Sequence, residues 1–217
     1  LVVPTEGCFL LDRRSGARIP DERVALFGAG GRLGRSLRRP AHHLDLFARE
    51  EAVAFLVASL AGETFGNAGR EARRVAAADA WDVLAGLTLG QDISDRIVQF
   101  SDDPAQFSLG KSFEAYGPTG PALVSLDAFD DPGDVGLWCE VDGERMQEGR
   151  TRDLIFSIPT LVAYLSSICT LLPGDLIFTG TPGGVGVARG RFLAAGELLR
   201  SGAEVIGELA NRCTGGE

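Results

Sequence analysis

The segment GLWCEVDGERMQ, residues 136–147, indicates the class of fold. Its first six residues form a strand-like run that leads into Asp142-Gly143, and residues 144–147 would form the return strand. An Asp-Gly pair between two such runs is a strong signal for a β-hairpin. On both sides of it, further short strand-like runs are separated by many of the 29 glycines. We therefore predict a β-rich α+β fold and not a doubly wound sheet.

Two segments between these runs have helical patterns. Residues 76–85 carry apolar side chains near one face, with Gly86 just after them. Residues 158–172 are amphipathic and are followed by Pro173-Gly174, which would end the helix. In this second segment three apolar side chains are expected to share one side: Leu161, Leu165 and Ile168.

Composition excludes several classes of partner. The 217 residues are 45% apolar, enough to build a full core, and the net charge of −9 argues against a nucleic-acid surface. The longest apolar run, residues 161–172, is too short to cross a bilayer, which needs about 20 residues. The four cysteines form no C-x-x-C pair, so we expect free, mostly buried thiols. We predict a cytoplasmic protein with no membrane or nucleic-acid partner.

Two glycine-rich segments could approach a ligand. The segment RVALFGAGGRLG, residues 23–34, resembles a dinucleotide fingerprint, but the third glycine position falls on Leu33, so a tight turn is the better interpretation. The segment GDLIFTGTPGGVG, residues 174–186, consists of a buried-strand pattern and a loop that lacks the Gly-Lys-Ser/Thr ending of a phosphate loop. A ligand beside Thr181 and a simple turn between strands both remain open.

Polar residues of a third segment, GQDISDRIVQ (90–99), suggest a site. If this segment is extended, Asp92, Ser94 and Arg96 lie on one face. They could form a salt bridge only, or a metal ligand beside a carboxylate clamp. Lys111, farther along, could be a solvated loop cation or a desolvated base or charge stabiliser.

Five pieces in order resemble the fumarylacetoacetate hydrolase family. The resemblance runs over about residues 51–213, through DISDRIVQ, GKSFEAYGPTGP, VDGERMQEGRTRDLIFSIPTLVAYLSS, LLPGDLIFTGTPGGVG and a tail with FLAAGELL and IGELANRC. It implies a mixed β-sandwich roll, usually dimeric, which binds Mg²⁺ or Mn²⁺ through carboxylates and acts on 2-oxo acids. We expect a homodimer of this kind, with residues 1–48 as an N-terminal segment or small subdomain and residues 49–217 as the catalytic domain.

The resemblance also implies roles for individual residues. Asp92 and Glu51 match metal-binding positions. Arg96 and Gln99 match residues that contact substrate and take part in catalysis, and Lys111 matches the lysine of the GKSF motif. Thr181, with Gly180 before it, matches the loop that binds the substrate's carboxylate or oxo group.

Two departures from the family pattern concern the metal and the base. The family's Glu-x-Glu is replaced by Arg49-Glu50-Glu51, and adjacent glutamates on a strand face opposite sides. The upstream His–Glu pair of the family's hydrolases is not recognisable, and only His42 and His43 are available. A surface position is the better interpretation for each of them.

Three functions follow from these patterns. The first is metal-dependent hydrolysis of a C–C bond in an acylpyruvate-like diketo acid. The second is decarboxylation, tautomerisation or isomerisation of a 2-oxo acid in the same pocket, as in a specialised biosynthetic pathway. Water activation needs the missing His–Glu pair, whereas enolate stabilisation does not. The third is a degenerate relative that binds a ligand without catalysis.

Overall fold

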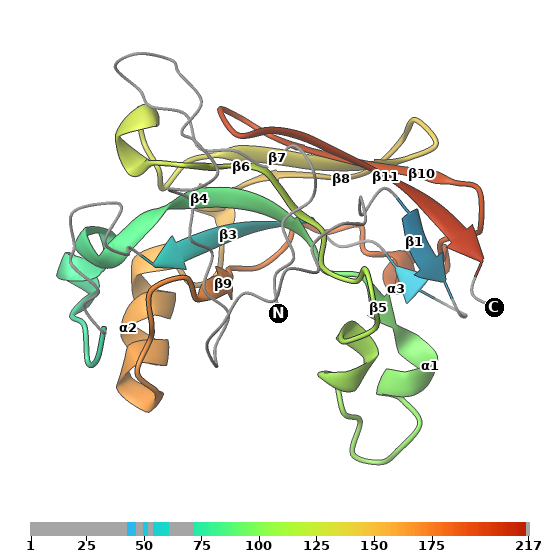
Figure 1. The fold of residues 1–217 in the computed structure, drawn as a ribbon, viewed down its shortest axis with the longest axis horizontal. Coiled ribbons are helices and arrows are strands. Elements are labelled where there is room, and N and C mark those ends of the chain that lie inside the picture. The colour runs from blue at the N-terminus through green and yellow to red at the C-terminus, as the bar shows by residue number, and fades with distance from the viewer. Residues whose placement is uncertain (1–42, 47–49, 52–53, 61–71, 216–217) are drawn as a thin grey trace, which may run out of the picture.

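The computed structural model describes residues 43–46, 50–51 and 54–60 by their backbone and residues 72–215 in full. Two sheets form two layers (Figure 1). One has five strands in the order β1-β11-β10-β7-β8: β1 His43–Leu46, β11 Gly207–Gly215, β10 Leu198–Ala203, β7 Gly136–Val141 and β8 Glu144–Arg150. The other has four in the order β6-β4-β3-β9: β6 Thr119–Val124, β4 Leu84–Gln91, β3 Ala54–Leu60 and β9 Leu176–Phe178. This arrangement confirms the β-rich prediction.

Short elements connect the strands. A two-stranded ribbon pairs β2 (Glu50–Glu51) with β5 (Ser94–Asp95). The helical turns are η3 Ala77–Val83, α1 Arg96–Gln99, η4 Leu109–Lys111, η5 Leu126–Ala128, η6 Thr151–Asp153 and α3 Gly186–Arg189, and the longest helix is α2 Ile158–Ile168. Among the described residues, no helix combines the length and the apolar character that crossing a membrane would require.

The β7–β8 hairpin has the predicted Asp-Gly turn. Asp142 and Gly143 both have positive φ, 48° and 83°, as the mirror-image hairpin turn requires. Side chains of β7 alternate, so that Leu137, Cys139 and Val141 are buried. They belong to the same buried cluster as the leucines of β4, between the two sheets, where each fully buried leucine contributes about 1.5–3 kcal/mol.

Both predicted helices differ from the structure. The segment predicted as one helix over 76–85 is a 3₁₀ helix, and β4 begins at Leu84 because Leu84 and Ala85 are buried in the sheet. The helix predicted over 158–172 ends at Ile168, since Leu171 pairs with Ala72 as a β-bridge.

The buried face of α2 also differs from the prediction. Ile158, Val162 and Ser166 are buried, while Ile168 is 60% exposed. Ser166 is on the inner side because its hydroxyl accepts a hydrogen bond from the Val75 amide at 3.0 Å. The helix therefore packs against η3 through a face that includes a polar anchor.

Two further predictions concern the strands β9 and β1. β9 is an edge strand, not the buried strand predicted, and Phe178 is partly exposed. β1, which falls within the predicted N-terminal segment, pairs in parallel with β11. The boundary at residue 48 stays a prediction, and the glycine-rich segment 23–34 lies outside the described residues.

Candidate active site

Asp92, Ser94 and Lys111 form one contact group. The Lys111 ammonium donates to the Asp92 carboxylate and, at 2.9 Å, to the Ser94 hydroxyl. Ser94 is fully buried, whereas the Asp92 and Lys111 side chains are 19% and 33% exposed. Lys111 is thus neither a fully solvated loop cation nor a fully desolvated base, and its charge lies beside a carboxylate that solvent or a ligand can reach.

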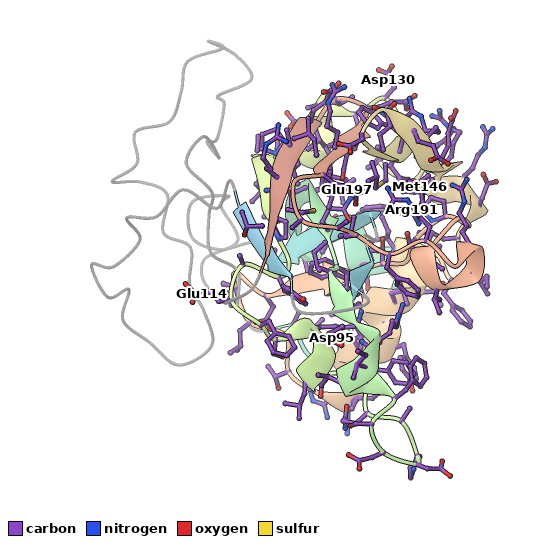
Figure 2. The ribbon with its side chains drawn as sticks, turned by 90° about the vertical axis from the view of Figure 1, so that its right-hand side faces the viewer. Asp95, Glu114, Asp130, Met146, Arg191 and Glu197 are labelled. Atoms are coloured by element: carbon purple, nitrogen blue, oxygen red, sulfur yellow. The ribbon has the colours of Figure 1, made fainter. Side chains whose placement is uncertain are left out.

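The segment 92–96 is not one continuous strand. β4 ends at Gln91, β5 is only two residues long, and Arg96 begins α1. The reason is local: the Asp95 carboxylate accepts a hydrogen bond from the Val98 amide at 2.9 Å and so caps the helix. Figure 2 shows Asp95 where β5 meets this helix. The prediction that Asp92, Ser94 and Arg96 lie on one face of a single strand is therefore wrong.

Arg96 and Gln99 are held together on α1. The Arg96 guanidinium donates to the Gln99 amide oxygen, and the Gln99 amide nitrogen donates to the Phe107 carbonyl at 3.1 Å. Gln99 is fully buried, and burial lowers the pKa of Arg96. A desolvated guanidinium binds a carboxylate more strongly than one in water.

The helix α1 also positions Lys111. Gly110 packs so closely on α1 that a Cβ atom there would lie 2.6 Å from both the Asp95 carbonyl and the Gln99 side chain. The lysine that follows Gly110 is therefore fixed relative to Gln99. This close approach joins the Arg96–Gln99 pair to the Asp92–Lys111 pair.

Backbone pairing brings Glu51 to the same region. β2 pairs with β5 so that Glu51 lies opposite Ser94, two residues from Asp92, and α3 contacts β2. The side chain of Glu51 lies outside the described part of the chain. Carboxylate oxygens suit Mg²⁺ or Mn²⁺, so the donor chemistry of Asp92 fits such an ion. Within the fully described residues 72–215, no three His, Cys, Asp or Glu side chains gather as a metal cluster.

The predicted substrate loop follows β9. Gly180 has φ +129°, and a Cβ atom there would lie 3.0 Å from the Leu154 side chain. Thr181 accepts a hydrogen bond at 2.8 Å from the side-chain amide of Gln147, a buried residue of β8. Sequence reasoning placed Gln147 in the return strand but gave it no role. No local pattern marks it, because a register shift in the hairpin decides that Gln147 and not Met146 pairs with the buried Cys139.

A groove lies away from these residues, on the five-stranded sheet. It has a volume of about 590 Å³ and is lined by residues that include Trp138, Arg150 and Glu204, and by none of the candidate site residues. Arg150 binds Glu204 there, which lowers the pKa of that carboxyl. The other two charged lining residues, Glu148 and Glu208, pair with Arg145 and Arg200 outside the groove. Each charge of the groove thus has a partner, and we assign the chemistry to the Asp92 group. The predicted surface positions of His42 and His43 lie outside the described side chains.

The sequence profile of the fumarylacetoacetate (FAA) hydrolase C-terminal domain matches residues 67–214. The chain belongs to this family. One relative is the fumarylacetoacetate hydrolase domain-containing protein 2 homolog of Dictyostelium discoideum. It is 39% identical over 154 residues, which cover 66% of this chain and 50% of that protein. The chain thus spans about half the length of the curated relatives it matches.

Solved structures of the family share the fold. A maleylpyruvate hydrolase from Sphingobium sp. SYK-6, in complex with manganese(II) and pyruvate, is 27% identical with a TM-score of 0.68; the match covers 82% of this chain and 63% of that one. A 5-carboxymethyl-2-hydroxymuconate delta-isomerase from Mycobacterium smegmatis is 31% identical with a TM-score of 0.68, over 82% of this chain and 68% of that one. The family fold thus carries both hydrolases and isomerases.

Proposed function

We propose that this chain is a metal-dependent hydrolase that cleaves a C–C bond in an acylpyruvate-like diketo acid. The observation that carries the proposal is the contact of Lys111 with Asp92 and Ser94, because it sets an ammonium beside a carboxylate at a partly open position. The relatives that act on maleylpyruvate support the substrate class. The predicted homodimer and cytoplasmic location remain predictions.

Asp92 and Glu51 would hold Mg²⁺ or Mn²⁺. When bound, such an ion supplies Lewis acidity toward the oxo and carboxylate oxygens of a 2-oxo acid. The related structure with manganese and pyruvate supports the use of a divalent ion, though not the choice of these two residues. Arg49, where the family has a glutamate, leaves two carboxylates for this role, and we expect the ion to bind more weakly than to three.

The chain's own residues would orient the substrate and carry its charge. Arg96, with its Gln99 partner, would bind one carboxylate, and the Gly180–Thr181 loop would bind the other polar end. Water adds to the distal carbonyl, the C–C bond breaks, and the electron pair remains on the pyruvate fragment as an enolate. Lys111 would stabilise that negative charge. The enolate then takes up a proton, so that one water is consumed and an acid and pyruvate are formed.

Isomerisation of a 2-oxo acid is the second candidate. The related delta-isomerase supports it, since it shares the fold at 31% identity. Enolate stabilisation by Lys111 is common to both reactions, whereas hydrolysis alone needs an activated water. Proton exchange on the substrate carbon without chain cleavage would favour isomerisation.

The test is cleavage of maleylpyruvate and fumarylpyruvate by the purified chain, followed by loss of the enol absorbance and by detection of pyruvate. We expect cleavage that stops with EDTA, returns with Mn²⁺, and is lost in Asp92→Asn. Asp102→Asn is the matched control, because Asp102 is an exposed aspartate outside the contact group. Cleavage that survives both EDTA and Asp92→Asn would overturn the proposal.

A further inference from the structure

We propose that Gln147 is a positioning residue that holds the Thr181 loop in its binding conformation, an inference that rests on the function proposed above. Gln147 lies on β8, 34 residues before Thr181 in the sequence. Its side-chain amide nitrogen donates to the Thr181 hydroxyl at 2.8 Å and to the Pro182 carbonyl at 2.9 Å. Both of its N–H groups are thus used on one loop.

Three contacts fasten the loop to β8. Besides the Gln147 bonds, Gly184 lies against the Met146 carbonyl, so that a Cβ atom there would overlap it, and Gly184 has φ +104°. A Cβ atom on Gly149 would lie 2.9 Å from the Pro182 ring. Two glycines permit this close approach, and the Gln147 amide supplies its directional bonds.

A β-bulge turns Gln147 inward. Next to the turn, Val141 pairs with Glu144 and Glu140 with Arg145, but Cys139 then pairs with Gln147 instead of Met146. The extra residue places Gln147 opposite the buried Cys139, and Gln147 is only 2% exposed. Bulges of this kind redirect a side chain and occur often beside active sites. A buried amide of this kind needs its hydrogen-bond partners, so the loop is bound where the amide can reach it.

The bond also orients Thr181. Since the Thr181 oxygen accepts from Gln147, its proton points away from Gln147, so this bond limits the direction in which the hydroxyl can donate. A substrate carboxylate or enolate oxygen requires such a donor. Gln147 itself is buried behind the loop, so it acts through Thr181 and not on the substrate.

The test compares Gln147→Met, Thr181→Val and the double variant in the intact chain. Methionine keeps the length of glutamine without a donor. With Mn²⁺ present, we expect oxalate affinity to fall about tenfold in each single variant, and no further in the double variant. For the cleaved substrate we expect KM to rise by a similar factor while kcat stays within about threefold. Amide hydrogen exchange of residues 179–186 should become faster in Gln147→Met.

Leu199→Ala is the control for general destabilisation, because Leu199 is a buried residue of β10 without a role in the loop. It should leave oxalate affinity and loop exchange unchanged while the protein remains folded. Unchanged affinity and exchange in Gln147→Met, or losses that add to those of Thr181→Val, would overturn the inference and leave the proposed function intact. Wild-type protein that neither binds oxalate nor cleaves an acylpyruvate would overturn both the inference and the proposed function. Faster exchange in Gln147→Met would then show only that Gln147 stabilises the loop.

Discussion

Lys111 contacts the carboxylate of Asp92 across 19 residues of sequence and thereby joins η4 to the end of β4. Such a pair is partly exposed, so its contribution to stability is small, about 0–1 kcal/mol. Its importance is chemical. The Lys111 ammonium neutralises the Asp92 carboxylate, which we assign as a ligand of the metal ion. The ammonium and the metal ion would therefore share this carboxylate.

Lys111→Met should therefore separate metal binding from catalysis. Without the neighbouring ammonium, Asp92 attracts a divalent cation at least as strongly, and we expect Mn²⁺ affinity by calorimetry to stay equal or to increase. Acylpyruvate cleavage should fall by about 100-fold or more, because the charge on the enolate loses its partner. Lys111→Arg is the charge-preserving control and should retain Mn²⁺ binding and part of the activity. Full activity in Lys111→Met would remove the lysine from the mechanism.

Gly110→Ala should destabilise the protein. The new methyl group would lie 2.6 Å from the Asp95 carbonyl, a backbone atom that cannot easily move, and we expect a cost of about 1–3 kcal/mol in unfolding free energy. Because Lys111 is adjacent, cleavage should fall as well. Gly215→Ala is the matched control, since a Cβ atom there makes an ordinary 3.7 Å contact and should change stability by less than about 0.5 kcal/mol. Equal denaturant midpoints for the two variants would contradict the close packing of η4 on α1.

Sequence patterns predicted the sheets better than the helices. Asp142-Gly143 determines a hairpin through the conformational preferences of two adjacent residues, so the sequence alone predicts it. The end of α2 depends instead on Leu171, which leaves the helix to pair with Ala72, 99 positions earlier. A contact of that kind is invisible to a window of neighbouring residues.

The candidate site shows the same division. Sequence motifs identify the candidates Asp92, Arg96, Gln99 and Lys111. In the structure Lys111 contacts Asp92, and Arg96 contacts Gln99. Gln147 could not be found in this way. Counting back from the turn predicts that Met146 lies opposite Cys139, and the bulge moves Gln147 to that position. A one-residue shift reverses which side chains face inward.

Cys139 is buried and Cys169 is exposed, so Cys139 should react with alkylating reagents more slowly than Cys169. Burial raises the pKa of Cys139 to about 11 from its usual 9.0. Alkylation at pH 8, mapped by mass spectrometry, should label Cys169 in the native protein and Cys139 only after denaturant is added. Labelling of Cys139 as fast as Cys169 would contradict its burial.

The same pKa sets a pH dependence. The native thiol keeps its proton where the unfolded thiol loses it, so its contribution to stability is fully present below pH 9 and is lost as pH rises through about 11. Comparison with Cys139→Ala isolates this part from other titrating groups. The difference in unfolding free energy between wild type and Cys139→Ala should shrink above pH 9. A constant difference up to pH 11 would show that the thiol is not shielded.

Gln91 should couple the two sheets. Its buried amide nitrogen donates to the Ser201 hydroxyl of β10 and to the Cys139 sulfur at 3.3 Å, so a residue of the four-stranded sheet is bound to the five-stranded one. Gln91→Met and Ser201→Ala should each lower the unfolding free energy by about 1–3 kcal/mol, because each leaves a buried polar partner unsatisfied. The double variant removes both polar groups and should cost less than the sum by about 1 kcal/mol.

Thr88→Val is the matched control for this cycle. Thr88 is also buried on β4, but among the described residues its hydroxyl has no hydrogen-bond partner. Valine has nearly the same shape without the buried polar atom, so we expect unchanged or slightly higher stability, by up to about 1 kcal/mol. Urea unfolding of all four variants gives the comparison. If Gln91→Met is as harmless as Thr88→Val, then the Gln91 bond does not hold the sheets together, and apolar packing between β4 and β10 alone must do so.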